Sequence, residues 1–98
     1  MSNEAEPKVV HNRELNRYEI EVEGHLSVLE YTREGNVITY THTEVPKALE
    51  GRGIAGRMAA KALGDAEAEG VQIVPQCSYI ETYVTRHPQF EAMVVKPG

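Results

Sequence analysis

Hydrophobic and polar residues alternate near the start of the chain. In the segment 17–23, Tyr18, Ile20 and Val22 are separated by glutamates. A period of two places alternate side chains on opposite faces of a strand. The segment therefore predicts a half-buried strand with its glutamates toward water.

Two further strands are predicted after this one. The segment 25–33 carries apolar residues on both faces of the expected strand, which indicates a more central strand. The segment 37–43 is rich in β-branched and aromatic residues, which favours another strand. Glycine-containing turn signals lie at 23–24 and 34–36. The three strands are expected to form an antiparallel meander.

The period changes after Gly51, and the chain becomes helical. One stripe of small and apolar residues recurs at helical spacing, and Gly70 supplies a stop signal. A helix is therefore predicted over 52–69. Its stripe consists of Ile54, Ala55, Met58, Ala59, Ala62, Leu63 and Ala66.

The last third predicts one short strand and a second helix. The strand covers 71–74. Ser78 and Glu81 match a capping box, with the serine as N-cap and the glutamate three residues later. The helix should run over 79–86 and end before Pro88.

These elements predict an α+β fold in the order β-β-β-α-β-α, with two helices and a mostly antiparallel sheet. The long helix allows the strands at 37–43 and 71–74 to pair in parallel. A chain of 98 residues has room for one domain. We expect a polar, disordered tail over 1–7 and a single domain over 8–98.

The composition of the chain limits which kinds of ligand and which cell compartment are expected. The net charge is −5, but the segment 47–61 has four basic residues and one acidic residue, which leaves −8 elsewhere. This distribution argues against nucleic acid and favours a small anionic ligand. A single cysteine and the lack of a signal peptide or long apolar run predict a cytoplasmic protein away from the membrane. The oligomeric state stays open, with a monomer among the options.

The turn Glu50–Ala55 precedes the long helix and carries candidate chemistry. Its glycines allow positive φ angles and close approach of a ligand to the backbone. The free N–H groups and the dipole of a helix N-terminus bind anions, and a pyrophosphate would fit. Spacing alone gives equal weight to a plain glycine-rich loop, because the Rossmann fingerprint and the Walker lysine are both absent.

Four short motifs in order resemble a known family. They are His42–Pro46, Gly51–Ala55, Val74–Tyr79 and Arg86–Pro88. Together they are similar to small GCN5-related N-acetyltransferase-like proteins of about one hundred residues, and the resemblance covers 16–95. It implies a shortened form of that fold and acetyl-CoA, or another coenzyme A thioester, as the ligand.

The resemblance also implies which residues bind coenzyme A. Gly53 and Ala55 match the last fixed positions of the family's phosphate-binding motif, whereas Glu50 departs from its first position. Backbone N–H groups around the turn would hold the pyrophosphate, and the strand end at 42–45 would pair with the pantetheine arm. The expected contacts are Val45, Gly51, Arg52, Gly53, Ile54, Ala55, Gly56 and Arg57.

Cys77 is the first candidate for the reacting centre. It lies between a strand and a helix, and a helix N-terminus favours the thiolate. The resemblance implies that this strand end borders the thioester, so Cys77 would accept the acetyl group or line the pocket. The alternative is a small buried hydrophobe, the usual role of a free cysteine.

His42 is the second candidate. An imidazole at the end of its strand is suited to taking a proton from an amine or thiol, and the resemblance places a histidine near the acetyl group. A surface histidine carries equal weight. Glu44 is a rival base, although a solvated loop carboxylate is the favoured interpretation.

The second helix has a stripe of apolar residues, Tyr79, Ile80, Tyr83 and Val84, which predicts core positions. The resemblance implies that Tyr83 and Arg86 contact the adenosine end of coenzyme A, although plain structural roles are favoured. Cysteine and histidine are scattered without metal-ligand spacing, so no metal is expected.

The resulting expectation is an acetyltransferase that moves an acetyl group from acetyl-CoA to an amine or another small nucleophile. One alternative is a non-catalytic module that binds coenzyme A or an acyl-CoA. Another is a protein-interaction domain in which the glycine turn is structural. Neither the acceptor nor acetylation of Cys77 is specified by the sequence.

Overall fold

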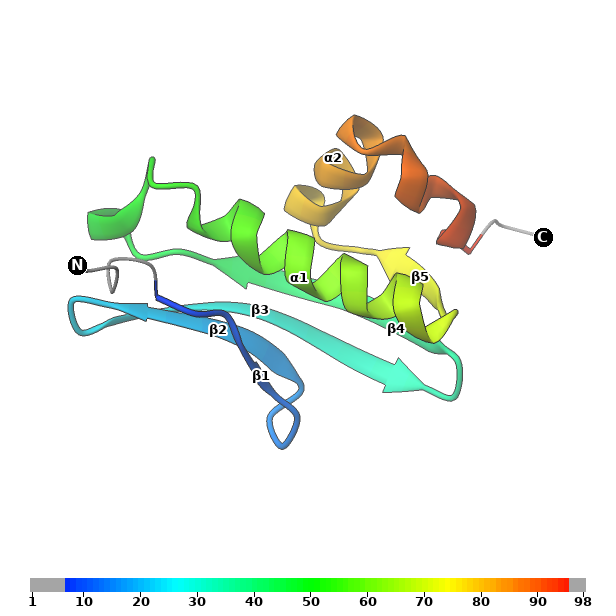
Figure 1. Ribbon diagram of the computed structural model, residues 1–98, viewed down its shortest axis with the longest axis horizontal. Helices are drawn as coiled ribbons and strands as arrows, with labels where there is room; N and C mark the ends of the chain where they lie inside the picture. Colours follow the sequence, from blue (N-terminus) through cyan, green and yellow to red (C-terminus); the bar gives the residue numbers. More distant parts are fainter. Residues whose placement is uncertain (1–6, 96–98) are drawn as a thin grey trace.

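The computed structural model describes residues 7–95. Within them, five strands and two α-helices form two layers (Figure 1). The strands are β1 (Val10–Asn12), β2 (Arg17–Val22), β3 (His25–Glu34), β4 (Val37–Glu44) and β5 (Gln72–Pro75). The helices are α1 (Ile54–Glu69) and α2 (Ser78–Arg86), with 3₁₀ helices η1 (Lys47–Leu49) and η2 (Pro88–Met93).

The sheet has the order β1-β2-β3-β4-β5. Its neighbours are antiparallel except for β4 and β5, which pair in parallel across the α1 crossover. The predicted α+β fold with a mostly antiparallel sheet is therefore confirmed. The sequence prediction missed β1, which adds an edge strand by pairing with β2. Of the tail predicted over 1–7, residues 1–6 lie outside the described residues.

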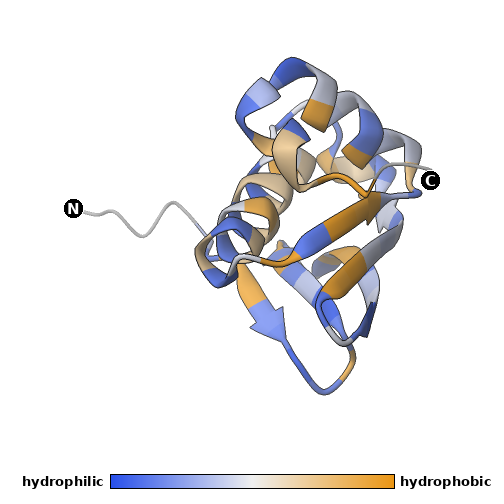
Figure 2. Cartoon of the chain, turned by 90° about the vertical axis from the view of Figure 1, so that its right-hand side faces the viewer, coloured by the Kyte–Doolittle hydropathy of each residue, from blue (hydrophilic) through white to orange (hydrophobic). Residues whose placement is uncertain are grey.

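Both α-helices cover the same face of the sheet. The buried core consists of one face of the strands and the inner stripe of α1, where Met58, Ala59 and Leu63 are fully covered. Figure 2 shows hydrophobic and hydrophilic residues alternating along the strands, as the predicted pattern requires. The other sheet face has no helix over it in the part of the chain described here (Figure 1).

The boundaries of α1 follow from two glycines. Gly53 is the N-cap with φ of 75°, and Gly70 is the C-cap with φ of 73°. Both angles lie in the left-handed region that L side chains rarely adopt. The helix therefore begins at Ile54, two residues later than predicted, and ends where the sequence indicated.

The predicted capping box at α2 is wrong. Cys77, rather than Ser78, is the N-cap, and no side chain caps this end. The reason is tertiary: the Cys77 N–H donates to the Tyr40 carbonyl at 2.8 Å. This bond continues the β4–β5 pairing by one step and holds Cys77 extended, so Ser78 becomes the first helical residue.

Candidate functional site

A cavity of about 270 Å³ lies where the end of β4, the turn before α1 and the start of α2 meet. Six of the predicted coenzyme A contacts line it. Three further residues, Leu49, Glu50 and Tyr79, complete the lining. The predicted contacts are Val45, Gly51, Gly53, Ile54, Ala55 and Gly56.

The N-terminus of α1 points N–H groups at this cavity. The first intrahelical bond joins the Arg57 N–H to the Gly53 carbonyl at 3.1 Å. The preceding N–H groups of the first turn therefore have no partner inside the helix. No side chain caps this end, and the first turn contains no acidic residue. The helix dipole and these donors together favour an anion.

Two glycines give the turn its shape. Gly51 has φ of 83° and Gly53 has φ of 75°. A Cβ atom added to either would meet no heavy atom within 4 Å. Conformation therefore requires glycine here, and the space beside the backbone stays open for a ligand.

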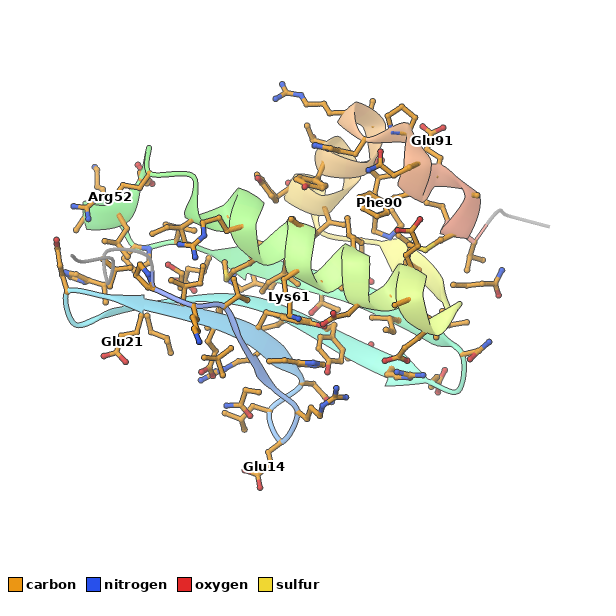
Figure 3. All side chains as sticks on the ribbon, in the orientation of Figure 1. Glu14, Glu21, Arg52, Lys61, Phe90 and Glu91 are labelled. Carbon is orange, nitrogen blue, oxygen red and sulfur yellow. The ribbon has the colours of Figure 1, made fainter. Side chains whose placement is uncertain are left out.

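The two arginines at the start of α1 lie outside this lining. Arg52 is paired with Glu23 at 3.4 Å on the surface (labelled in Figure 3). Arg57 is half-buried and donates to the Pro7 carbonyl. Glu50, the residue that departs from the family motif, does line the cavity. The backbone dipoles therefore face the cavity more directly than the arginine side chains do.

Tyr79 is the lining residue that the sequence pattern misassigned. It was predicted as core, but 37% of its surface is exposed. Its hydroxyl lies 3.5 Å from the point where a Cβ on Gly56 would stand. Burial and the nearby Tyr83 raise the pKa of Tyr79 above its ordinary value of 10. The hydroxyl is therefore protonated at neutral pH and can donate a hydrogen bond. In the sequence, the only signal for this role of Tyr79 is its spacing of four residues from Tyr83. Each tyrosine directly precedes a buried residue, Ile80 or Val84, so both lie at the edge of the buried stripe of α2.

Beside the cavity, β4 continues after its pairing with β5 ends. The last register pair is Tyr40 with Pro75, followed by the bond from Cys77. From that point to Glu44, the described hydrogen bonds of the β4 ladder go to β3. The edge of β4 that faces away from β3 is thus available to an extended ligand.

A β-bulge decides where the two reactive candidates lie. Register shifts between Glu30 and Tyr31, so Thr41 of β4 is an extra residue. After the bulge, His42 is on the sheet face opposite the helices, and Thr43 is on the helix face. Without the bulge, alternation from buried Tyr40 would reverse both positions.

Cys77 and His42 therefore lie on different sides of β4. Cys77 is half-buried, and its sulfur is 3.2 Å from the Thr43 hydroxyl. His42 is exposed, and its Nε2 is 3.3 Å from Glu44 Oε1. Glu44, the rival base, is thus the hydrogen-bond partner of His42. The His42 imidazole therefore has the Glu44 carboxylate as a partner that can orient it, whereas the partner of the Cys77 thiol is the Thr43 hydroxyl.

The two residues expected at the adenosine end lie away from this lining. Tyr83 is half-buried and stacks on His87 with ring centroids 3.9 Å apart. Arg86 is exposed in the last turn of α2. Neither lines the cavity, so a contact with coenzyme A would lie beyond its rim.

Residues 7–95 contain neither a cluster of metal ligands nor a helix that could span a membrane. This part of the chain contains no group of three or more histidine, cysteine or acidic residues arranged to hold a metal ion. It likewise contains no helix with the length and hydropathy needed to span a membrane.

Comparisons with known proteins agree with this fold. Residues 17–93 match the family model described as GCN5-related N-acetyl-transferase. The chain is similar to Protein NATD1 of mouse and of human, each 34% identical over 84 residues, which is 83% of this chain and 76% or 74% of the relative. A Staphylococcus aureus GCN5-like putative N-acetyltransferase solved by NMR has the same fold, with a TM-score of 0.72, 18% identity and coverage of 96% of this chain and 93% of its own. The chain therefore belongs to the GCN5-related N-acetyltransferase family.

Proposed function

We propose that this protein binds acetyl-CoA and transfers its acetyl group to an amine or another small nucleophile. The observation that carries the proposal is the cavity at the N-terminus of α1, which is lined by Glu50, Gly51 and residues 53–56 and bordered by the end of β4. This arrangement offers donors to a pyrophosphate and a strand edge to the arm attached to it. Family membership supports the same assignment.

Each part of the coenzyme has a proposed partner. The pyrophosphate would accept hydrogen bonds from the N–H groups that begin α1, with Arg52 and Arg57 adding positive charge nearby. The pantetheine arm would pair with the β4 edge that is free beyond the last β5 contact. Tyr79 would donate its hydroxyl proton to a phosphate or amide oxygen at the cavity wall.

The transfer itself requires one proton acceptor and one stabilised oxyanion. The neutral amine attacks the thioester carbonyl, and backbone N–H groups stabilise the negative oxygen that forms. As the carbon–sulfur bond breaks, His42 takes the proton released by the new amide nitrogen, and the coenzyme thiolate leaves. Glu44, hydrogen-bonded to His42, would orient the ring and stabilise its charged form.

Cys77 has two proposed roles. In one, its sulfur lines the thioester end of the site while the amine attacks directly. In the other, the Cys77 thiolate attacks acetyl-CoA, releases coenzyme A and passes the acetyl group to the acceptor. Because Cys77 and His42 lie on different sides of β4, we favour direct attack with His42 as base. Cys77→Ala should then retain transfer.

The test of this function is acetyl transfer by the full chain. Acetyl-CoA is mixed with a panel of primary amines, and release of the coenzyme thiol and the mass of the acceptor are measured. We expect His42→Gln to slow transfer about 100-fold or more while coenzyme A binding is retained. His25→Gln, which changes an exposed histidine that starts β3 opposite Val22, is the matched control. If coenzyme A binds but no amine is acetylated, the non-catalytic binding module is the better account.

A further inference from the structure

One face of the sheet is uncovered within the described chain. The helices α1 and α2 pack on the other face, as Figure 1 shows. In Figure 3 the labelled Glu21 extends from β2 away from α1. We call this uncovered side the open face, and its side chains follow from the strand register.

The open face carries two rows of paired residues. One row joins Arg17, Glu30 and His42 across β2, β3 and β4. The next row joins Glu19, Val28 and Glu44 across the same strands. Directly opposite residues in a sheet share a face, and their Cβ atoms are about 5 Å apart. Both rows therefore present their side chains together, and they include the proposed base.

The charge of this face is strongly negative. Five glutamates and one arginine belong to it. Arg17 is already bonded to Glu19 at 2.6 Å, and Asn12 donates to the same carboxylate. Among residues 7–95, the other carboxylates are left without a cationic partner, except that Glu44 contacts His42. The glutamates of the face are Glu19, Glu21, Glu30, Glu34 and Glu44.

Apolar side chains lie between these carboxylates. Val28 is in the same row as Glu19 and Glu44, but only 9% of its surface is exposed. Leu26, opposite Glu21, is 42% exposed, and Val10, opposite Glu19, is 53% exposed. Aliphatic stems of lysine or arginine can pack on such residues while their charged ends reach the glutamates.

The face is larger than a small amine. Strands lie about 4.8 Å apart, so β2 and β4 are separated by about 10 Å. At about 3.4 Å per residue, Glu30 and Glu34 are about 14 Å apart along β3. A chain with several separated cations matches this spread, whereas one ammonium group would meet only one or two carboxylates.

The basic segment 47–61 and the acidic open face lie on opposite sides of the sheet. The basic segment 47–61 leads into α1 on the helix side, where the coenzyme is proposed to bind. The open face has the acidic excess. In Figure 3 the labelled Arg52 and Glu21 extend to opposite sides of β2. An anionic donor and a cationic acceptor would thus be directed to different sides, with β4 between them.

We propose that the open face docks a lysine-rich peptide segment and presents one of its amines to His42. The proposal rests on the proposed acetyl transfer and names its acceptor class. Glu21, Glu30 and Glu34 would bind neighbouring cations, while the exposed Leu26 and Val10 would contact their stems. The reacting lysine would lie beside His42 and Glu44 at the end of β4.

The test uses the full chain and a fluorescent peptide that alternates lysine with glycine. We expect the peptide to bind at low salt and to weaken as ionic strength rises to about 0.15 M, because exposed charges are screened. The double variant Glu21→Gln, Glu30→Gln should bind about fivefold more weakly, the scale of two exposed ion pairs. Glu67→Gln with Glu91→Gln removes the same charge from the helix side and should leave binding unchanged.

Binding is located by the backbone amide NMR shifts of the protein. Shifts concentrated in β2, β3 and the end of β4 support the proposal, and shifts confined to α2 and η2 overturn it. Equal binding of a glutamate–glycine peptide overturns the charge argument. Equal affinity for spermine, at the same concentration of positive charge, overturns the choice of an extended peptide.

Coenzyme A is titrated into the same samples, which separates this proposal from the proposed function. Coenzyme binding without peptide binding overturns only the docking of the peptide. Peptide binding without coenzyme binding supports the docking surface and overturns the acetyl transfer on which its use depends. Both ligands binding, with the lysine amine acetylated, supports the two together.

Discussion

The two α-helices begin in different surroundings, although neither is capped by a side chain. At α1 the N-cap is Gly53, the first turn has no acidic residue, and the cavity adjoins it. At α2 the N-cap is Cys77, whose N–H is bonded to the sheet, and Glu81 lies in the first turn.

This difference is why we propose the anion site at α1, because a helix N-terminus can bind an anion only when its environment leaves it open. At the start of α2, the partial positive charge of the helix dipole is offset by the Glu81 carboxylate, and this end packs on β4 and β5. At the start of α1, the dipole faces the cavity. The start of α2 instead places a thiol and a tyrosine near the site that α1 forms.

The largest effect is expected for Gly53→Val. Coenzyme A at about 100 times its Kd should stabilise the native protein by about 2.7 kcal/mol, and this variant should abolish that gain, because a branched side chain would block the approach to the backbone. The strained φ should also cost about 1–3 kcal/mol of unfolding free energy. Thermal unfolding with and without coenzyme A measures both quantities.

Gly70→Val is the matched control at the other end of α1. It has nearly the same positive φ and no role in the cavity lining. It should lose similar intrinsic stability and keep the full gain from coenzyme A. An equal loss of that gain in both variants would remove the turn from the binding site.

A tenfold effect is expected at Cys77. Iodoacetamide should alkylate this half-buried thiol, and acetyl-CoA at ten times its Kd should slow the reaction about tenfold by occupying the site. Intact-protein mass spectrometry over time measures the rate. If acetyl-CoA leaves the rate of alkylation unchanged, the start of α2 is not part of the coenzyme site.

Tyr79→Phe should weaken coenzyme A binding about fivefold, the scale of one neutral hydrogen bond. The protein should unfold at the same temperature without ligand, because the hydroxyl lies in the exposed cavity wall. Calorimetry gives the affinity, and Tyr83→Phe is the control on the next turn of the same helix. Equal affinities for the wild type and Tyr79→Phe would restrict Tyr79 to shaping the wall.

The smallest effect is expected for Arg52→Gln. Its guanidinium is exposed and already paired with Glu23, so its loss should weaken coenzyme A about two- to fivefold, with the difference fading at high salt. Arg13→Gln removes the same charge from the β1–β2 turn and should change affinity less. A larger effect at Arg13 would contradict the placement of the phosphates at α1.

Much of the fold could be predicted because its signals are local. The alternation of Tyr18, Ile20 and Val22 predicts β2, and the glycine at position 70 predicts the end of α1. The edge strand β1 has only three residues, too few for a period to be recognised. Its existence depends on pairing with β2, which no local pattern encodes.

The candidate site was harder to predict because long-range contacts fix it. The carbonyl of Tyr40 determines that Cys77 is an N-cap, and these residues are far apart in sequence. The bulge at Thr41 determines the faces of His42 and Thr43, and strict alternation would assign both incorrectly. The glycine turn was found because positive φ is a local requirement that glycine meets.

The most direct test of the central claim compares coenzyme A with pantetheine, which lacks the pyrophosphate and the adenosine 3′-phosphate attached to it, by calorimetric titration of the full chain. If the start of α1 holds the pyrophosphate, coenzyme A should bind one to one, and pantetheine should bind at least about 100-fold more weakly, because charge-assisted hydrogen bonds contribute about 1.5–3 kcal/mol each. Absence of binding by coenzyme A, or equal affinity for the two compounds, would contradict the account.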